Sequence, residues 1–178
     1  MRIVLRAVFL AGVIWGSVSA GTIQYQVVDL GQNSFRLTYS VSDFSFLENQ
    51  ELAIEFDPAV YRSLSNGVAP AGFDLLLLQP NNPFGAFGIF SALALVNDPV
   101  LSGIFSVDVV LTGTGRPGEQ RFDINQLDGN GIFLSRISSG VTVDATTTPE
   151  PATLPIAGVA LLIGGVLPAV RRRVKSRV

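Results

Sequence analysis

Residues 34–41 read Ser-Phe-Arg-Leu-Thr-Tyr-Ser-Val, and this stretch decides the fold class. Apolar side chains stand at positions 35, 37, 39 and 41, and polar ones stand between them. This period-two alternation is typical of a β-strand with one face buried and the other in water. The stretch therefore predicts a strand that covers a hydrophobic core.

Similar apolar or alternating runs recur along the middle of the chain and predict eight or nine strands. The predicted strands are residues 22–28, 34–41, 52–56, 73–78, 88–96, 105–111, 122–124, 131–137 and 141–143. Turn-forming residues separate them at 31–33, 57–58, 65–67, 79–83, 97–99, 113–118 and 128–131. Residues 45–48 match the start of a helix, but no helical period follows, so a single turn is predicted there. We expect an all-β fold, a single antiparallel β-sandwich of the immunoglobulin-like or jelly-roll kind.

The apolar positions of these strands predict the core. About 128 residues lie between the apolar ends of the chain, enough to bury most of the unfolded surface. The residues expected to be buried are Phe35, Leu37, Tyr39, Ile54, Phe56, Phe105, Val107, Val109 and Phe122.

Two segments are similar to parts of cohesin-like sandwiches. Residues 52–61 read LAIEFDPAVY, a strand followed by Asp-Pro and further apolar residues. The second segment is residues 105–124, which include the stretch VVLTGTGRPGEQRFDI. The resemblance implies a jelly-roll interaction module, and it names no ligand.

Charge is unevenly distributed along the chain. The middle carries five arginines against thirteen acidic residues, a formal charge of −8, whereas the other basic residues flank the two apolar ends. So acidic a domain repels phosphate backbones, and we expect no nucleic-acid partner.

The chain has no cysteine and no histidine. Without cysteine, the stability of the domain must come from packing rather than from disulfides. Without histidine, Ser-His-Asp and Cys-His catalysis and the commonest metal ligand are excluded. Carboxylate chemistry remains open, and no cofactor is expected.

The N-terminus has the pattern of a secretory signal peptide over residues 1–20. Arg2 and Arg6 precede an apolar stretch, which ends in the small residues Val18-Ser19-Ala20. This pattern predicts cleavage between Ala20 and Gly21. The alternative is an N-terminal membrane helix that is not cleaved.

The C-terminus combines three features in order. Residues 147–153 contain Pro149-Glu150-Pro151, and the two prolines predict an extended, exposed segment. Residues 154–170 are apolar and, as a helix of about 25 Å, reach the lower limit for a transmembrane span. Residues 171–178 form a basic tail that is expected to stay in the cytoplasm. The alternative is a plain C-terminal anchor that is never cut.

This series closely resembles the PEP-CTERM sorting signal of Gram-negative exported proteins. The family is processed by the membrane protease-transpeptidase exosortase, often alongside exopolysaccharide production. The resemblance implies that Pro149, Glu150 and Pro151 form the recognition motif, and that Arg171, Arg172 and Arg173 form the retention signal. It covers under a fifth of the chain and implies an inner-membrane precursor with a periplasmic domain, later placed on the cell surface or in the matrix.

Two glycine- or aromatic-rich loops suggest binding functions but have simpler interpretations. Residues 113–118 spell GxGxxG, yet Pro117 interrupts the motif and a strand follows, so a hairpin loop is predicted. Residues 81–87 form a polar-aromatic loop that could stack on sugars or on a protein. The preferred interpretation is that its phenylalanines tuck under the sandwich.

Two sets of oxygen-bearing side chains are the remaining candidates. Asp123, Asn125, Asp128 and Asn130 could offer ligands to calcium, but their spacing departs from the EF-hand loop and the pairs 128–129 and 130–131 suit a hairpin turn. A second set could supply a glycosidase pair: Glu48, Glu51, Glu55 and Asp57. Glu51 and Glu55 are instead predicted to point into solvent from an edge strand.

The sequence as a whole predicts a non-enzymatic surface or matrix protein with one sandwich domain at residues 21–146. The expected partners are the membrane itself, exosortase, and exopolysaccharide or another surface protein. A binding module for polysaccharide or protein is the first alternative, which an exposed aromatic patch or large apolar face would favour. A carboxylate-dependent glycan hydrolase is the second.

Overall fold

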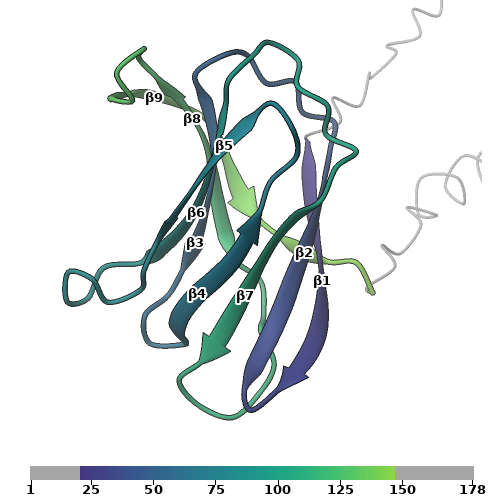
Figure 1. Ribbon diagram of the computed structural model, residues 1–178, viewed down its shortest axis with the longest axis vertical. Helices are drawn as coiled ribbons and strands as arrows, with labels where there is room; N and C mark the ends of the chain where they lie inside the picture. Colours follow the sequence, from purple (N-terminus) through teal and green to yellow (C-terminus); the bar gives the residue numbers. More distant parts are fainter. Residues whose placement is uncertain (1–20, 147–178) are drawn as a thin grey trace, which may run out of the picture. The chain divides into compact units, whose positions relative to one another are not determined.

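A computed structural model of the protein describes residues 21–146, in which every regular element is a β-strand (Figure 1). In this part of the chain no helix is long and apolar enough to cross a bilayer. The predicted signal peptide, Pro-Glu-Pro segment, membrane helix and basic tail lie outside the described residues.

Ten strands form two five-stranded sheets. The strands are β1 (Thr22–Gly31), β2 (Ser34–Ser42), β3 (Gln50–Phe56), β4 (Tyr61–Val68), β5 (Phe73–Leu78), β6 (Gly88–Ala94), β7 (Phe105–Leu111), β8 (Arg121–Leu127), β9 (Phe133–Val141) and β10 (Val143–Asp144). Sheet A has the order β10-β1-β2-β7-β4, and sheet B has the order β5-β6-β3-β8-β9. Neighbouring strands are antiparallel except β1 and β10, which are parallel. The fold is therefore a β-sandwich with one parallel pair, rather than the purely antiparallel one expected.

The core lies between the inner faces of the two sheets, where the alternating apolar side chains meet. All nine residues predicted to be buried are buried. In sheet A, Leu37 lies opposite Val107, and both are fully buried. Phe73 of sheet B meets Phe105 of sheet A edge to face, with ring centroids 5.2 Å apart. Burial of this shared apolar surface is what holds the sheets together.

A buried polar network crosses the core beside these apolar contacts. Gln120 is 2% exposed; its Oε1 accepts from the hydroxyls of Tyr39 and Thr142, and its Nε2 donates to Tyr61 and to the Gly118 carbonyl. The backbone amide of Gln120 also donates to Thr142, at 2.9 Å. The network thus joins β2 and β4 of sheet A to the loop before β8 and to the link between β9 and β10. Burial raises the pKa of the Tyr39 hydroxyl well above its usual value.

Strand β4 was not predicted, and residues 65–67 were wrongly predicted to form a turn. Only Tyr61 and Leu64 of β4 are buried, so the strand has no period-two alternation. Its register against β7 shifts twice, and Asn66 has a left-handed φ of 48°. A bulge and a turn favour the same Asn-Gly residues, and pairing with β7 decides between them.

Two further expectations about topology are wrong. Residues 113–118 lie in a loop that leads from β7 in sheet A to β8 in sheet B, so they do not form a hairpin. Strand β3, which carries Glu51 and Glu55, lies between β6 and β8 and is therefore central rather than at an edge. The predicted turn at residues 128–131 does join two paired strands, β8 and β9.

Candidate functional site

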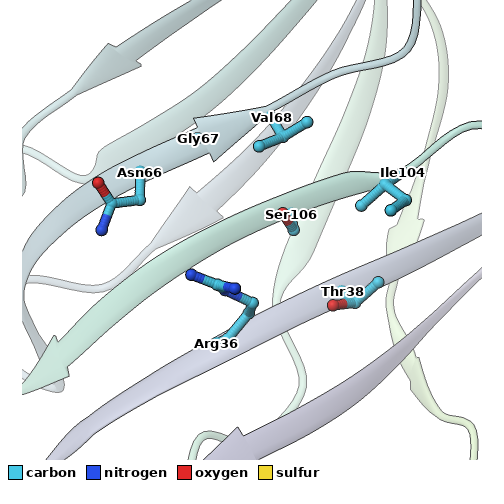
Figure 2. Close-up of a pocket in the computed structure, with 7 residues that line it drawn as sticks. All are labelled: Arg36, Thr38, Asn66, Gly67, Val68, Ile104 and Ser106. Atoms are coloured by element: carbon cyan, nitrogen blue, oxygen red, sulfur yellow. The ribbon is translucent and has the colours of Figure 1, made fainter. Parts of the chain in front are cut away.

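A hollow of about 510 Å³ lies on the outer face of sheet A (Figure 2). Strands β2, β7 and β4 supply its walls, because every second residue of a strand points away from the core. Figure 2 shows Arg36 and Asn66 toward one end, Val68, Ile104 and Thr38 toward the other, and Ser106 between them. One end of the hollow is therefore polar and the other mainly aliphatic.

Asp108 organises the polar end. Its Oδ1 accepts from Arg36 Nε at 2.7 Å, and its Oδ2 accepts from Arg36 Nη2 and Asn66 Nδ2, each at 2.9 Å. Asp108 is only 7% exposed. The hydrogen bonds from Arg36 outweigh burial and lower the pKa of Asp108, and the same contact raises the pKa of Arg36. The ionised form of Asp108 is thus favoured, and both of its oxygens are engaged by Arg36 and Asn66.

The Asp108 interactions predict a specific pH dependence of stability. The folded-state pKa of Asp108 is lowered, so its contribution is present above the unfolded pKa of about 4 and is lost as the pH falls through the folded value. We expect Asp108→Asn to be less stable than the unaltered protein at pH 7, and the difference to shrink toward pH 2. Urea unfolding at a series of pH values measures this. The expectation fails if the difference is the same at pH 7 and pH 2.

The loop between β5 and β6 projects from the sandwich (lower left in Figure 1) and presents aromatic rings to solvent. Phe84 is 94% exposed and Phe87 is 43% exposed, so the expectation that the phenylalanines tuck under the sandwich is wrong. The loop is nevertheless ordered by its own hydrogen bonds: the Asn81 amide donates to the Ala86 carbonyl, and Asn81 Oδ1 accepts from the Gly85 amide, both at 2.8 Å. These bonds satisfy the backbone locally and leave Phe84 without a cover among the described residues.

A second hollow, of about 420 Å³, lies beside this loop at the end of the sandwich. Its lining includes Phe87, Glu55, Asp57, Glu119 and Arg121. Two of the carboxylates are already engaged: Glu55 lies 3.9 Å from Arg121 Nε, and Asp57 accepts from the Ala59 amide at 2.8 Å. The hollow thus combines the Phe87 ring with several charged side chains.

The candidate glycosidase carboxylates do not converge on one cleft. Glu51 bonds to the Ser91 hydroxyl at 2.5 Å and to Asn125 Nδ2 at 3.0 Å on the outer face of sheet B. Glu48 and Asp57 lie beyond opposite ends of β3, while Glu55 and Asp57 share the end hollow. Glu51 is therefore part of a polar network and not a free surface acid, which the sequence alone did not indicate.

The candidate calcium residues are spread over β8 and the turn that follows it. Asp123 pairs with Arg136 Nη2 at 2.8 Å, and Asp128 accepts from the backbone amides of Asn130 and Ile132, which lower its pKa. Asn125 Oδ1 is buried with no hydrogen-bond partner in the described part of the chain. Within residues 21–146, no three acidic side chains gather in a way that would hold a metal ion.

Residues 113–118 precede strand β8 rather than a helix, so the structure does not form the strand–glycine loop–helix unit that a dinucleotide site needs.

Gly21, the predicted first residue of the mature chain, packs against the Phe44 ring, where an added Cβ would come within 2.6 Å. The sorting and retention residues at 149–151 and 171–173, and Ala20, lie outside the described part.

Comparison with known proteins adds little to this geometry. No protein-family model and no curated protein matches the sequence. Among solved structures, the GH20 exo-β-N-acetylglucosaminidase of Vibrio harveyi, crystallised with N-acetylglucosamine, is similar over 70% of this chain and 17% of that one, at 16% identity and a TM-score of 0.31. The chain thus corresponds to a small part of that enzyme, and a similarity this weak carries no argument about activity.

Proposed function

We propose that this chain is an exported, non-enzymatic cell-surface or extracellular-matrix protein, sorted by exosortase through a PEP-CTERM tag and associated with exopolysaccharide. The observation that carries the proposal is the order of parts after the folded domain. The compact unit ends at Thr146, and Pro149-Glu150-Pro151, the apolar run and the arginine cluster follow directly. In sequence, the motif therefore begins three residues after the end of the folded unit.

Each part of the tag has a separate physical task in this proposal. The apolar run of residues 154–170 delivers the motif to the membrane surface. The arginines stop translocation, because moving each of them through hydrocarbon costs far more than leaving it in water. The prolines keep the motif extended, since they can neither continue a helix nor donate to a strand ladder.

Replacing Pro149, Glu150 and Pro151 by alanine should leave a membrane-inserted chain that is not cut, since the protease loses its motif while the helix remains. Immunoblots of membrane and medium fractions measure this, and mass spectrometry of the mature protein should find Gly21 at its N-terminus. Processing of the alanine variant at the normal rate would reduce the C-terminus to a simple anchor.

Replacing Arg171, Arg172 and Arg173 by glutamine should have a different effect, weakened retention and mislocalisation. The matched control is the pair Lys175→Gln and Arg177→Gln, which removes charge from the same tail and keeps the cluster. If the control mislocalises the chain as strongly as the cluster variant, total tail charge rather than the cluster is the signal.

The finer description of the domain as a cohesin-like jelly roll belongs to the same proposal. Its support is local: after β3, the backbone carbonyl of Asp57 accepts from the amides of Val60 and Tyr61, so Asp-Pro forms a tight turn into β4. In the proposal this domain recognises other molecules and performs no reaction.

Polysaccharide binding by the loop of residues 79–87 is a second candidate function, and the exposure of Phe84 favours it. An exposed ring on an ordered loop can stack on a sugar. The adjacent hollow, with Phe87 on its wall, would take the neighbouring sugar unit.

Phe84→Ala should weaken binding to exopolysaccharide isolated from the producing cells by about threefold to tenfold, because stacking is lost. Phe84→Trp should strengthen it, since the larger ring stacks better. Val100→Ala, at a similarly apolar site that is 66% exposed, is the control. Co-sedimentation with the polymer measures all three, and equal binding by the two Phe84 variants would rule out a stacking role.

A further inference from the structure

The outer face of sheet A carries a groove made of two adjoining hollows. The hollow of Figure 2 meets another of about 540 Å³, which lies farther along β7. Asn66 lines both, and Arg36 in one bonds to Asp108 in the other. Along β7 the groove runs from Ile104 to Val110, a span of about 20 Å at the rise of a strand. Its length therefore suits an extended chain better than a single small molecule.

Ser106 is a polar residue of the groove that the described part of the protein leaves without a partner. It is 4% exposed and lies at the middle of the hollow of Figure 2. Among residues 21–146, no group forms a hydrogen bond with its hydroxyl. Ser91, a similarly buried serine of sheet B, instead bonds to Glu51 at 2.5 Å. Because buried hydroxyls are normally hydrogen-bonded, Ser106 indicates a ligand in the hollow that it lines.

The lining of the groove carries no net charge, although the domain is acidic. Its one guanidinium, on Arg36, and its one carboxylate, on Asp108, bond to each other at 2.7 and 2.9 Å. The other polar side chains of the lining end in hydroxyl or amide groups: Gln32, Ser34, Thr38, Ser65, Asn66 and Ser106. An anionic ligand would meet a domain of formal charge −8 with no free cation in this lining. The groove therefore suits a neutral ligand that is rich in hydroxyl groups.

The backbone beneath the groove is already paired, which argues against a peptide ligand. Strand β7 is hydrogen-bonded to β2 on one side and to β4 on the other. An extended peptide is usually held by main-chain bonds to a free sheet edge, and the groove lies across a face instead. A sugar chain binds through its hydroxyl groups and the C–H faces of its rings. These match the hydroxyl and amide groups of the lining and the aliphatic side chains of Val68 and Ile104.

We propose that the groove over β2, β7 and β4 binds a neutral polysaccharide chain, with the Ser106 hydroxyl bonded to a hydroxyl group of one sugar unit. The inference rests on the proposed association with exopolysaccharide, and it names the binding face and the class of sugar. The pair Arg36–Asp108 lies at the middle of the groove, and the Arg36 side chain is 46% exposed, so the chain would pass over it. This face is separate from the loop of residues 79–87, which joins two strands of sheet B.

Two buried serines provide a matched test. Ser106→Ala in the full-length protein should weaken binding of neutral exopolysaccharide fragments by about threefold to tenfold, the loss of one hydrogen bond. It should leave the melting temperature unchanged, because the hydroxyl has no partner among residues 21–146. Ser91→Ala should do the reverse, since it breaks the bond to Glu51 and lies on the other sheet. Unchanged binding by Ser106→Ala, or a melting temperature lowered as much as in Ser91→Ala, overturns the proposal.

The fragments also test the class of sugar. Exopolysaccharide from the producing cells is partly hydrolysed and divided by anion exchange into neutral and acidic fractions, and titration calorimetry measures the binding of each in a polyoxyethylene detergent. The neutral fraction should bind more tightly. Binding of the acidic fraction alone, or binding that Phe84→Ala abolishes and Ser106→Ala leaves intact, overturns the groove as the site while the association with exopolysaccharide stands. Binding of neither fraction contradicts that association and the groove together, and the immunoblots of the tag variants still judge sorting separately.

Discussion

Gln120→Ala is expected to lower the free energy of unfolding of the 21–146 domain by about 3 kcal/mol. The side chain is 2% exposed and bonds to Tyr39, Tyr61, Thr142 and the Gly118 carbonyl. Alanine would leave several of these polar groups buried without partners, and each such group costs about 1–3 kcal/mol. The loss is large because the network joins the two sheets, so no single partner can turn to water without disturbing the others. Urea unfolding followed by circular dichroism measures it.

Tyr39→Phe provides the control for this expectation. It removes one hydroxyl and leaves the other Gln120 contacts in place, so it should cost only about 1 kcal/mol. The double variant Tyr39→Phe with Gln120→Ala should be less destabilised than the sum of the single variants, because the Tyr39 hydroxyl is no longer left unpaired. Strict additivity would show that the network is not coupled.

Leu37→Ala and Val107→Ala should each lower the free energy of unfolding by about 2–4 kcal/mol. The two residues face each other across β2 and β7, and both are fully buried. Truncation removes apolar area from the core and leaves a cavity that the tightly packed sheets cannot close. Because the residues are neighbours, the double variant should depart from additivity.

Leu76→Ala is the matched control for the core substitutions. Leu76 is also an apolar strand residue, but it is 55% exposed, so its loss should cost under about 0.5 kcal/mol. If Leu37→Ala left the melting temperature unchanged, the inward-facing register of β2 would be wrong.

The two halves of the proposed function rest on different kinds of evidence. The proposed tag is read from short stretches of sequence, such as the prolines of residues 149–151 and the arginines of residues 171–173. Recognition by the domain depends on which side chains the fold leaves exposed, and Phe84 is such a feature.

Period-two alternation predicted most of the fold because it reports directly on a sheet with one buried face. Residues 34–41 and 105–111 became β2 and β7, with the predicted side chains buried. The method failed at β4, where two bulges break the alternation and only pairing with β7 holds the strand. It also joined Val141, the last residue of β9, and Val143, the first residue of β10, in one predicted strand, because two residues are too few to show a period.

The candidate sites were less predictable, because a side chain's role depends on its neighbours across the sheet. Glu51 was expected at a solvated edge, but β3 is central and Glu51 bonds to Ser91 and Asn125. Asp108 gave no signal in the sequence, since its partners Arg36 and Asn66 are 72 and 42 residues away. Phe84 was expected to be covered, and the internal hydrogen bonds of its loop hold it in water instead.

The sequence by itself determined the fold class and the identity of the core, because alternation and hydrophobicity are properties of neighbouring residues. Only the tertiary structure decided which strands lie at an edge, which acids are paired, and which apolar residues stay in water. These properties arise from contacts between segments far apart in the chain, such as β3 with β6 and β8, and they are fixed only when the sheets assemble. Strand β9 is a clear case, because the exposure of its apolar residues follows from its place at the edge of the sheet.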